Sequence, residues 1–294
     1  MSYPGLLALR NSPTESLVEA HYDATTELFR VAASMESPNI VVIPACNEER
    51  DLPAALLSLS RSSSPVLPVV VENGSQASDK TVEYAERMGA IAIRCEPAKM
   101  RATQVGLQYA LAHFPEQKVV HFGDADNLYP RFCIPAIARA THKANERNNE
   151  KGALLFGMGA YDHGSSMIVD LMRSGRVARK AVLRRLKNEA PMPYGCNYAI
   201  HVGNSDEFID AIGSIEPRLF VREESAICKA AFNAGATISQ LVSPAAYVLT
   251  RGDLISTRDE WRNFKGASMQ TKTDYYKRKY KDVEFVPNED GRKT

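Results

Sequence analysis

Two patterns of apolar and polar positions alternate along the chain from residue 39 onward. Short runs of apolar, largely β-branched residues are typical of buried strands, and apolar residues at every third or fourth position are typical of helices. The predicted strands are residues 39–44, 66–72, 90–94 and 118–123, and the predicted helices between them are residues 50–60, 79–88 and 100–113. Because parallel strands need crossover connections, usually helices, this alternation predicts a Rossmann-like α/β fold. Its doubly wound, mostly parallel sheet would be covered on both faces.

The flanking segments add helices to this core. Before it, Leu17, Val18, Leu28 and Val31 recur at roughly helical spacing, which predicts a peripheral helix over residues 14–35. After it, the pattern predicts helices over 131–147, 167–187 and 223–236 and a strand over 153–160. No stretch has the composition of a linker, so we expect one domain with helical extensions at both ends. The expected divisions are residues 1–38, 39–150, 151–250 and 251–294.

Composition and charge narrow the classes of protein. The 294 residues are 44% hydrophobic and 24% charged, which is typical of a globular protein and excludes a wholly disordered chain. The 36 Lys and Arg residues balance 35 Asp and Glu residues, so charge indicates no nucleic-acid partner. No apolar run reaches the ~20 residues of a membrane-spanning helix, and we expect a cytoplasmic protein. The five cysteines are widely spaced, which predicts free thiols.

Polar residues follow the predicted strands at the points where ligands bind in such sheets. They are residues 46–49 after the first strand, 72–75 after the second and 124–126 after the fourth. Asp124 and Asp126 can hold a hard divalent cation whose open positions take diphosphate oxygens. Paired acids also cap helices and occupy loops, so Asp-x-Asp alone leaves both interpretations open.

Several segments, in order and spacing, resemble the family 2 glycosyltransferases of the GT-A fold. The resemblance covers about residues 39–240. The segments that carry it are VVIPACNEERDLPAALLSL, VVVENGSQASDKT, AKMRATQVGLQYA, the Asp124-Ala125-Asp126 turn, YGCNYAI and REESAICKAAFNAGA.

The chain departs from the family pattern at two turns. Glu72 and Asn73 stand where the family usually has two aspartates. In the segment similar to Gly-Lys-Gly-x-x-x-Asn-x-Gly, Lys99 and Gly106 are retained, whereas Ala98 and Met100 replace glycines and Gln104 replaces the asparagine. The Asp-x-Asp motif matches without departure.

The resemblance implies a metal-dependent, inverting glycosyltransferase that uses a nucleotide sugar, a UDP- or GDP-sugar, and transfers the sugar to a hydroxyl. Residues 39–150 would form the donor half and residues 151–250 the acceptor half. Mn²⁺ or Mg²⁺ would bind Asp124 and Asp126. The catalytic base would come from Glu223 and Glu224, with Glu224 favoured because the second acid of the family's pair is usually the base.

The resemblance also implies a set of donor contacts. Pro44 and Ala45 would lie beside the base and ribose, Glu48 near the ribose or phosphates, and Glu72 against the nucleobase edge. The full set expected to bind the nucleotide sugar is Pro44, Ala45, Glu48, Glu72, Lys99, Arg101, Asp124 and Ala125. Structural interpretations stay open for some of them, because Glu48 also suits a first helical turn and Lys99 a solvated helix start.

The expected acceptor is a glycan, a lipid-linked compound or another hydroxyl compound. The predicted helix 167–187 holds seven basic residues and one acid, which suits contact with an anionic acceptor or with the inner face of a membrane. A core-packed helix with a solvated basic face explains the same pattern.

Two other functions remain open. A nucleotidyltransferase of related fold also binds a nucleotide and a metal, but the segment after the first strand lacks the expected glycine-rich loop. A nucleotide-sugar-binding protein without turnover would explain the departures near residues 72 and 98–104. A dinucleotide dehydrogenase is disfavoured because Gly-x-Gly-x-x-Gly is absent after the first strand.

Overall fold

The structure, a computed structural model, describes residues 8–9, 12–161, 179, 183, 197–203, 206–218, 223–241, 243 and 247–250. Its elements up to the middle of the chain are α2 (Thr14–Ala33), β1 (Asn39–Ala45), α3 (Leu52–Ser60), β2 (Val66–Glu72), α4 (Thr81–Arg87), β3 (Ile91–Arg94), α5 (Lys99–His113), β4 (Val119–Gly123), β5 (Asn127–Leu128) and α6 (Cys133–Arg147). The later elements are β6 (Ala153–Phe156), β7 (Met158–Tyr161), β8 (Asn197–His201), α8 (Glu207–Gly213), α9 (Glu223–Asn233), β9 (Thr237–Gln240) and β10 (Tyr247–Thr250).

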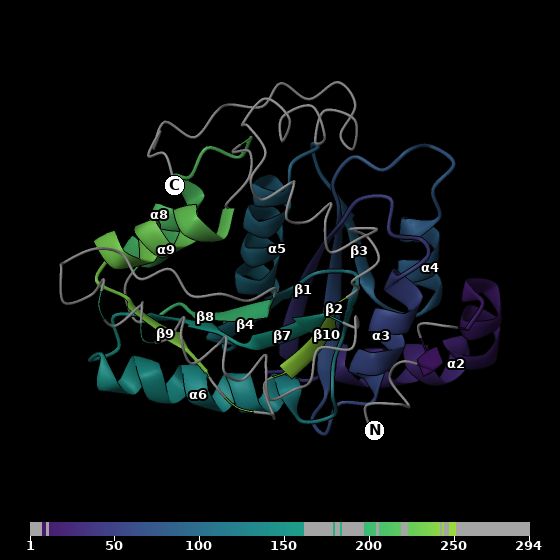
Figure 1. Cartoon of the computed structure of the whole chain (residues 1–294), viewed down its shortest axis with the longest axis horizontal. Coiled ribbons are helices and arrows are strands. Elements are labelled where there is room, and N and C mark those ends of the chain that lie inside the picture. The colour runs from purple at the N-terminus through teal and green to yellow at the C-terminus, as the bar shows by residue number, and fades with distance from the viewer. Residues whose placement is uncertain are drawn as a thin grey trace.

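Among the described strands, seven form the main sheet in the order β3-β2-β1-β4-β8-β6-β9 (Figure 1). β1 to β4 pair in parallel, β8 runs antiparallel to both of its neighbours, and β6 pairs with β9 in parallel. The predicted α/β fold with a mostly parallel sheet is therefore confirmed. A smaller sheet of β5, β10 and β7 lies beside it.

The strand predicted over residues 153–160 is wrong in one respect, because the chain changes sheets at Gly157. β6 belongs to the main sheet and β7 to the small one. The Gly157 N–H still bonds to the Asn197 carbonyl at 3.0 Å, and the Gln240 amide donates to the Gly157 carbonyl at 2.7 Å. These bonds hold the chain at the point where it leaves the main sheet.

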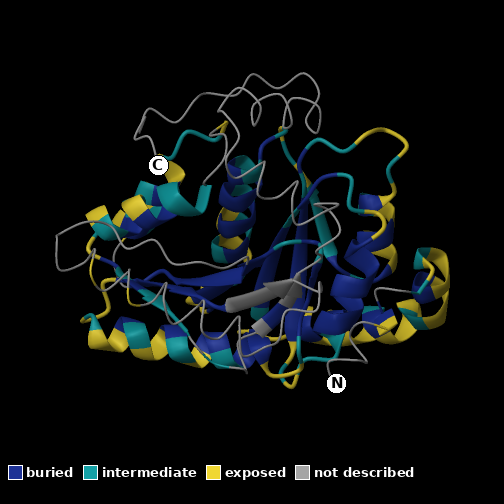
Figure 2. Ribbon diagram, viewed as in Figure 1, coloured by how far each residue is buried: buried dark blue, intermediate teal, exposed yellow. Residues whose placement is uncertain are grey.

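Two hydrophobic layers cover the main sheet, and successive strand residues point into opposite layers. Val41 and Ile43 of β1 pack with α2, α3 and α6, whereas Ile40 and Val42 pack with α5, α8 and α9. Figure 1 shows α6 below the sheet and α5, α8 and α9 above it, and Figure 2 shows that the strands between them are buried. Helices on both faces leave the strand ends for ligands.

The helix predicted over residues 14–35 exists as α2, but its buried face differs from the predicted one. Leu28 and Val31 are 50% and 45% exposed. Phe29 and Ala32 are buried instead, in line with Val18 and Thr25. These residues recur at intervals of seven, four and three, so they form one helical stripe against the core.

The described part of the chain also tests two predictions from the sequence, which concern the cysteine thiols and membrane-spanning helices. Cys95 and Cys228 are free thiols, as predicted. Within the described residues, no helix combines the length and the apolar character needed to cross a membrane.

Candidate active site

The candidate site lies where the carboxyl ends of β1, β2 and β4 meet the first residues of α5 and α9. β1 and β2 end in register, with Ala45 paired to Glu72. Asp124 follows β4, Lys99 opens α5, and Glu223 opens α9. The polar residues expected from the sequence at the strand ends are therefore joined there by two helix N-termini.

Lys99 connects the acids after β4 to the acids of α9. Its Nζ lies 2.8 Å from Asp124 Oδ1, 3.0 Å from Glu223 Oε1 and 3.8 Å from Glu224 Oε1. These are the side chains for which the sequence predicted metal, base and phosphate roles, and the structure brings them together around one ammonium group. A freely solvated lysine at a helix start, the other interpretation, is not what the structure shows.

The charges of this cluster depend on one another. Burial opposes the charge of Lys99, but Asp124, Glu223 and Glu224 outweigh it and raise the pKa of Lys99 well above its ordinary value. Burial, and then the neighbouring Glu223, raises the pKa of Glu224 to about 7, while Lys99 acts in the opposite direction. A carboxyl group with a pKa near 7 is suited to accept a proton at neutral pH.

Tyr129 supports the Asp124-Ala125-Asp126 turn through a hydrogen bond to its backbone. The Tyr129 hydroxyl donates to the Asp124 carbonyl at 3.4 Å, and a Cβ on Gly123 would lie 1.9 Å from that hydroxyl oxygen. Only glycine at 123 therefore lets the tyrosine support the turn. Ala125, between the two aspartates, is buried in the hydrophobic core.

The donor set at this turn suits a hard cation. Asp124 and Asp126 supply carboxylate oxygens, which Mg²⁺ and Mn²⁺ prefer. Within the described residues, no group of three or more His, Cys, Asp or Glu side chains is placed to hold a metal ion. Two protein carboxylates fit a cation whose remaining ligands are water and diphosphate oxygens.

At the end of β2, Glu72 stabilises its own turn. One oxygen of its carboxylate accepts hydrogen bonds from the backbone N–H groups of Gly74, at 2.7 Å, and Ser75. The neighbouring Asn73 is 1% exposed, and neither its amide nitrogen nor its amide oxygen has a hydrogen-bond partner in the described part of the chain. The sequence analysis noted Asn73 only as a departure from the family's aspartate and assigned it no contact.

The loop after β1 is tied to the loop after β2. Asn47 adopts a positive φ of 56°, its N–H donates to Ser75 Oγ at 2.9 Å, and its side-chain oxygen accepts from the Gln76 N–H at 2.8 Å. The Glu48 N–H donates to Thr81 Oγ1 at 2.8 Å. α3 begins at Leu52 with no acid in its first turn, so the first-turn interpretation of Glu48 is wrong.

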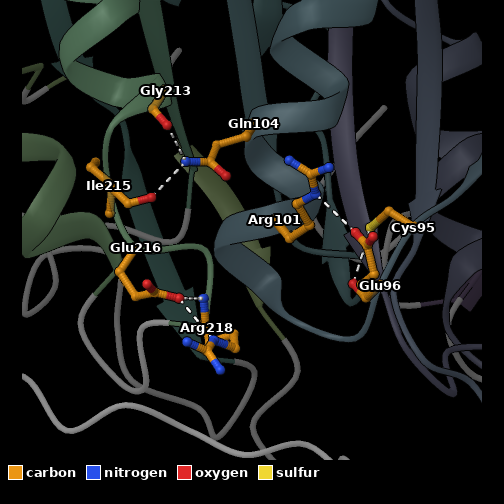
Figure 3. Close-up of polar contacts among 8 residues, drawn as sticks. All are labelled: Cys95, Glu96, Arg101, Gln104, Gly213, Ile215, Glu216 and Arg218. Carbon is orange, nitrogen blue, oxygen red and sulfur yellow. Dashed lines mark hydrogen bonds and ion pairs between the residues drawn. The ribbon is translucent and has the colours of Figure 1, made fainter.

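The remaining expected donor contacts differ in exposure. Ala45 is buried and Pro44 is partly exposed at the end of β1. Arg101 does not share the Lys99 ion pairs described above but pairs with Glu96, with 3.0 Å between Arg101 Nε and Glu96 Oε2 (Figure 3). The predicted basic helix 167–187 lies outside the described residues except for Arg179 and Leu183.

Tyr198 on β8 is a residue that sequence reasoning missed. Its ring stacks on Phe122, with 5.0 Å between the ring centroids, and its hydroxyl forms a hydrogen bond with Thr103. Burial, and then the charge of Glu224, raises the pKa of this hydroxyl well above its ordinary value. Its place between Asn197 and Ala199 in the YGCNYAI segment was the available signal.

Comparison with known protein families decides where the chain belongs. The family model described as glycosyl transferase family 2 matches residues 40–201, more than half of the chain. The chain is a member of glycosyl transferase family 2. The match runs from β1 to β8, so it includes Lys99, Asp124 and Tyr198, whereas Glu223 and Glu224 lie beyond it.

A curated relative of this family 2 chain is similar to it over only part of its length. A 4,4'-diaponeurosporenoate glycosyltransferase of Staphylococcus haemolyticus (strain JCSC1435) is 37% identical over 104 residues, which are 34% of this chain and 27% of the relative. The chain thus aligns with about a quarter of the length of that curated relative.

Two solved structures resemble it at low identity. TarS 1–349 of S. aureus, in complex with UDP-GlcNAc, is 17% identical with a TM-score of 0.47, over 73% of this chain and 58% of that one. Glucosyl-3-phosphoglycerate synthase of Mycobacterium tuberculosis, in complex with Mn²⁺, UDP and phosphoglyceric acid, is 18% identical with a TM-score of 0.48. That alignment covers 88% of this chain and 84% of the synthase.

Proposed function

We propose that this family 2 chain transfers a sugar from a nucleoside diphosphate sugar, a UDP- or GDP-sugar, to an acceptor hydroxyl. The observation that carries the proposal is the ammonium of Lys99, which lies within 3.0 Å of both Asp124 and Glu223. Groups that serve a leaving diphosphate and groups that accept a proton thereby occupy one site. Family membership favours this activity over nucleotidyl transfer.

The donor side of the site lies in residues 39–150. Asp124 and Asp126 would hold Mn²⁺ or Mg²⁺, which when bound supplies positive charge to the leaving diphosphate. Lys99 adds a fixed positive charge beside Asp124, which favours a phosphate-rich ligand. Pro44, Ala45 and Glu48 line the same edge of the sheet.

Asn73 is the residue best prepared to contact the nucleobase. An amide donates one hydrogen bond and accepts another, which matches the adjacent N–H and C=O groups of uracil or guanine. A buried amide without partners costs about 1–3 kcal/mol, and a bound base would remove this cost. Glu72, whose carboxylate closes the turn, shapes the loop that carries Asn73.

The acceptor side lies in residues 151–250 and contributes the base. Glu224 takes the proton of the acceptor hydroxyl as that oxygen bonds to the anomeric carbon and the carbon–diphosphate bond breaks on the opposite face. This geometry inverts the configuration. The raised pKa of Glu224, about 7, supports its role as the base, and Glu223 holds Lys99.

Binding measurements with a panel of nucleotides test the proposal. UDP, GDP, ADP, UDP-glucose and GDP-mannose are titrated into the protein by calorimetry, with and without Mn²⁺, and nucleotide release from the sugar donors is followed. We expect one nucleobase class to bind in a metal-dependent way. At 100 times its dissociation constant, that ligand would stabilise the fold by about 2.7 kcal/mol. Absence of binding by every nucleotide would overturn the proposal.

Asn73→Leu provides the specific variant for the nucleobase contact. It keeps the volume of the side chain and removes both hydrogen-bonding groups, so the metal-dependent affinity for the nucleotide should fall by about 5- to 100-fold. Affinity for inorganic diphosphate with Mn²⁺, which has no base, should stay unchanged. Equal losses for both ligands would remove Asn73 from the nucleobase contact.

A further inference from the structure

One buried amide links the donor half to the acceptor half. Gln104 of α5 is 3% exposed, and its Nε2 lies 3.0 Å from the carbonyl oxygen of Ile212. The same nitrogen lies 3.2 Å from the carbonyl oxygen of Gly213 and 2.9 Å from that of Ile215 (Figure 3). Because all three partners are carbonyl acceptors, the group of Gln104 that faces them must be the amide NH₂ and not the amide oxygen. Because that group has two hydrogens, one of them is shared between two carbonyls.

These carbonyls stand at the end of α8, where a helix leaves its last carbonyl groups without intrahelical partners. Ile212 and Gly213 are the final residues of α8, and Ile215 lies in the turn that follows. A local bond from the Ile215 N–H also reaches the Ile212 carbonyl, at 3.2 Å, and Gln104 adds a cap from the side chain of a distant helix. It therefore fixes the end of α8 relative to α5.

α5 is itself held firmly against the sheet. A Cβ on Gly106 would lie 2.2 Å from Val42 Cγ1, so the glycine allows α5 to lie unusually close to β1. Gln104 projects from the turn of α5 that contains this contact. The end of α8 is bonded to α5, and α5 packs closely on β1. α5 therefore fixes the position of the α8 end relative to the strands that precede the donor loops.

α8 transmits this position to α9. Phe208 and Ile212 of α8 belong to the same buried cluster as Ile227 and Ala231 of α9. Such apolar packing is non-directional, so it tolerates small sliding movements between helices. The hydrogen bonds of Gln104 are directional and restrict that movement.

α5 then meets α9 directly at its first residue. Lys99, about 7.5 Å before Gln104 along the helix axis, contacts Glu223 at 3.0 Å. The segment from Ile212 to Glu223 is consequently attached to α5 at both ends. Both attachments come from the helix whose first residue also contacts Asp124.

From this arrangement we propose that Gln104 is a positioning residue, which sets the distance between the base on α9 and the donor site at Asp124. The proposal rests on the proposed function. A proton acceptor acts only within about 3 Å of its hydroxyl, and misplacement by about 1 Å lowers rates by about 10²-fold. Loss of the Gln104 contacts should therefore lower turnover and spare donor binding, since Lys99, Asn73 and Asp124 stay in place.

Three variants separate positioning from general stability. Gln104→Met keeps the length of the side chain without the donors, and Gln104→Asn keeps the donors on a side chain one methylene shorter. Gln108→Met is the matched control, because Gln108 is an exposed glutamine one turn further along α5. Turnover is measured with UDP-glucose or GDP-mannose, whichever the wild type binds, with Mn²⁺ and water as the acceptor.

We expect Gln104→Met to lower kcat by about 10- to 100-fold with the donor KM within about threefold of wild type. Gln104→Asn should recover part of this loss, and Gln108→Met should match wild type. An unchanged kcat in folded Gln104→Met would overturn the proposal, as would a change confined to KM. If Gln104→Met does not fold, the same split in Gln104→Asn decides.

Hydrogen exchange keeps this test separate from the proposed function. Peptides from α8 and α9 should exchange faster in Gln104→Met than in Gln108→Met, whether or not any nucleotide sugar is turned over. A wild type without turnover would count against glycosyl transfer alone. Equal exchange in the two variants would overturn the positioning role of Gln104.

Discussion

The two acids that begin α9 differ in their distance from Lys99 and in their electrostatic surroundings. Glu223 lies 3.0 Å from Lys99 and supplies the closer counter-charge, whereas Glu224 lies 3.8 Å away with its pKa raised to about 7. A base must be deprotonated to act, so turnover should rise with pH through this value. The family pattern alone favoured Glu224, and the electrostatics supply an independent reason.

Glu224→Gln should lower the transfer rate by about 10²–10⁴-fold and abolish the rising limb near pH 7, because an amide cannot accept the proton. Donor affinity should stay close to wild type. The measurement is the pH dependence of kcat, with Glu223→Gln as the matched control. A near-normal rate in Glu224→Gln together with a collapse in Glu223→Gln would exchange the two roles.

Lys99 lowers the pKa of Glu224 against the effects of burial and Glu223. Lys99→Met should therefore move the rising limb of the pH–rate profile to higher pH by about one unit or more, the size expected for loss of an opposite charge at this distance. Lys99→Arg keeps the charge and should leave the limb near its wild-type position. A limb that stays in place in Lys99→Met would show that Lys99 does not control Glu224.

Such contacts lie beyond what the sequence could predict. Lys99, Asp124 and Glu224 are each singled out by residue type and by their place after strands or at helix starts. Their meeting at one ammonium group depends on how α9 packs over the sheet, which local pattern does not specify. Asn73 was assigned no contact for a different reason, because its importance rests on burial without partners, a property that only the folded chain has.

At the scale of elements, apolar periodicity predicted the helices and strands of the core, and packing determined some of their limits and buried faces. The strand over 66–72 has the predicted limits, since an unbroken apolar run has few alternatives. The break between β6 and β7 escaped prediction because the apolar run continues through Gly157, while the hydrogen-bond partners change there. For α2, two candidate stripes overlap in sequence, and contact with the core selects the one containing Phe29.

Gly106 gives an element-scale prediction about the contact between α5 and β1. Gly106→Ala should destabilise the fold by about 1–3 kcal/mol, because its Cβ would lie 2.2 Å from Val42 Cγ1. Gly213→Ala is the control, since a Cβ there meets nothing within 4 Å. Urea unfolding measures both, and the double variant Gly106→Ala/Val42→Ala should recover part of the loss. Equal stability of the two alanine variants would contradict the close approach.

At the scale of the whole molecule, one sheet unites the two proposed halves. β4, followed by Asp124, pairs with β8, and β8 pairs with β6, so donor and acceptor segments share a continuous hydrogen-bonded layer. The layer fixes the strand ends, while α9, on one face of the sheet, carries the proposed base. Gln104 and Lys99 of α5 complete this link on the helical side. The site is therefore a property of the packed sheet and helices together.

Two buried histidines on the opposite face of this sheet make the stability of the molecule depend on pH. His121 of β4 is 2% exposed and neither ring nitrogen has a hydrogen-bond partner in the described residues, while His201 of β8 packs edge-to-face with His142 of α6. Burial, and then the neighbouring His142, lowers the pKa of His121 to about 3 and that of His201 to about 4. Both groups are therefore neutral in the folded protein.

The unfolded chain binds protons at these histidines below its ordinary pKa of about 6.5, and the folded chain does not until about pH 4. Their contribution to stability is complete above pH 6.5 and is lost as the pH falls, by about 1.4 kcal/mol per histidine and pH unit.

His121→Leu removes one such group. When the pH is lowered from 7.5 to 5.5, its free energy of unfolding, measured with urea, should therefore fall by less than that of wild type. The exposed His142→Gln serves as the control and should retain most of the wild-type dependence. Identical pH dependence in His121→Leu and wild type would show that His121 is not held neutral beneath the sheet.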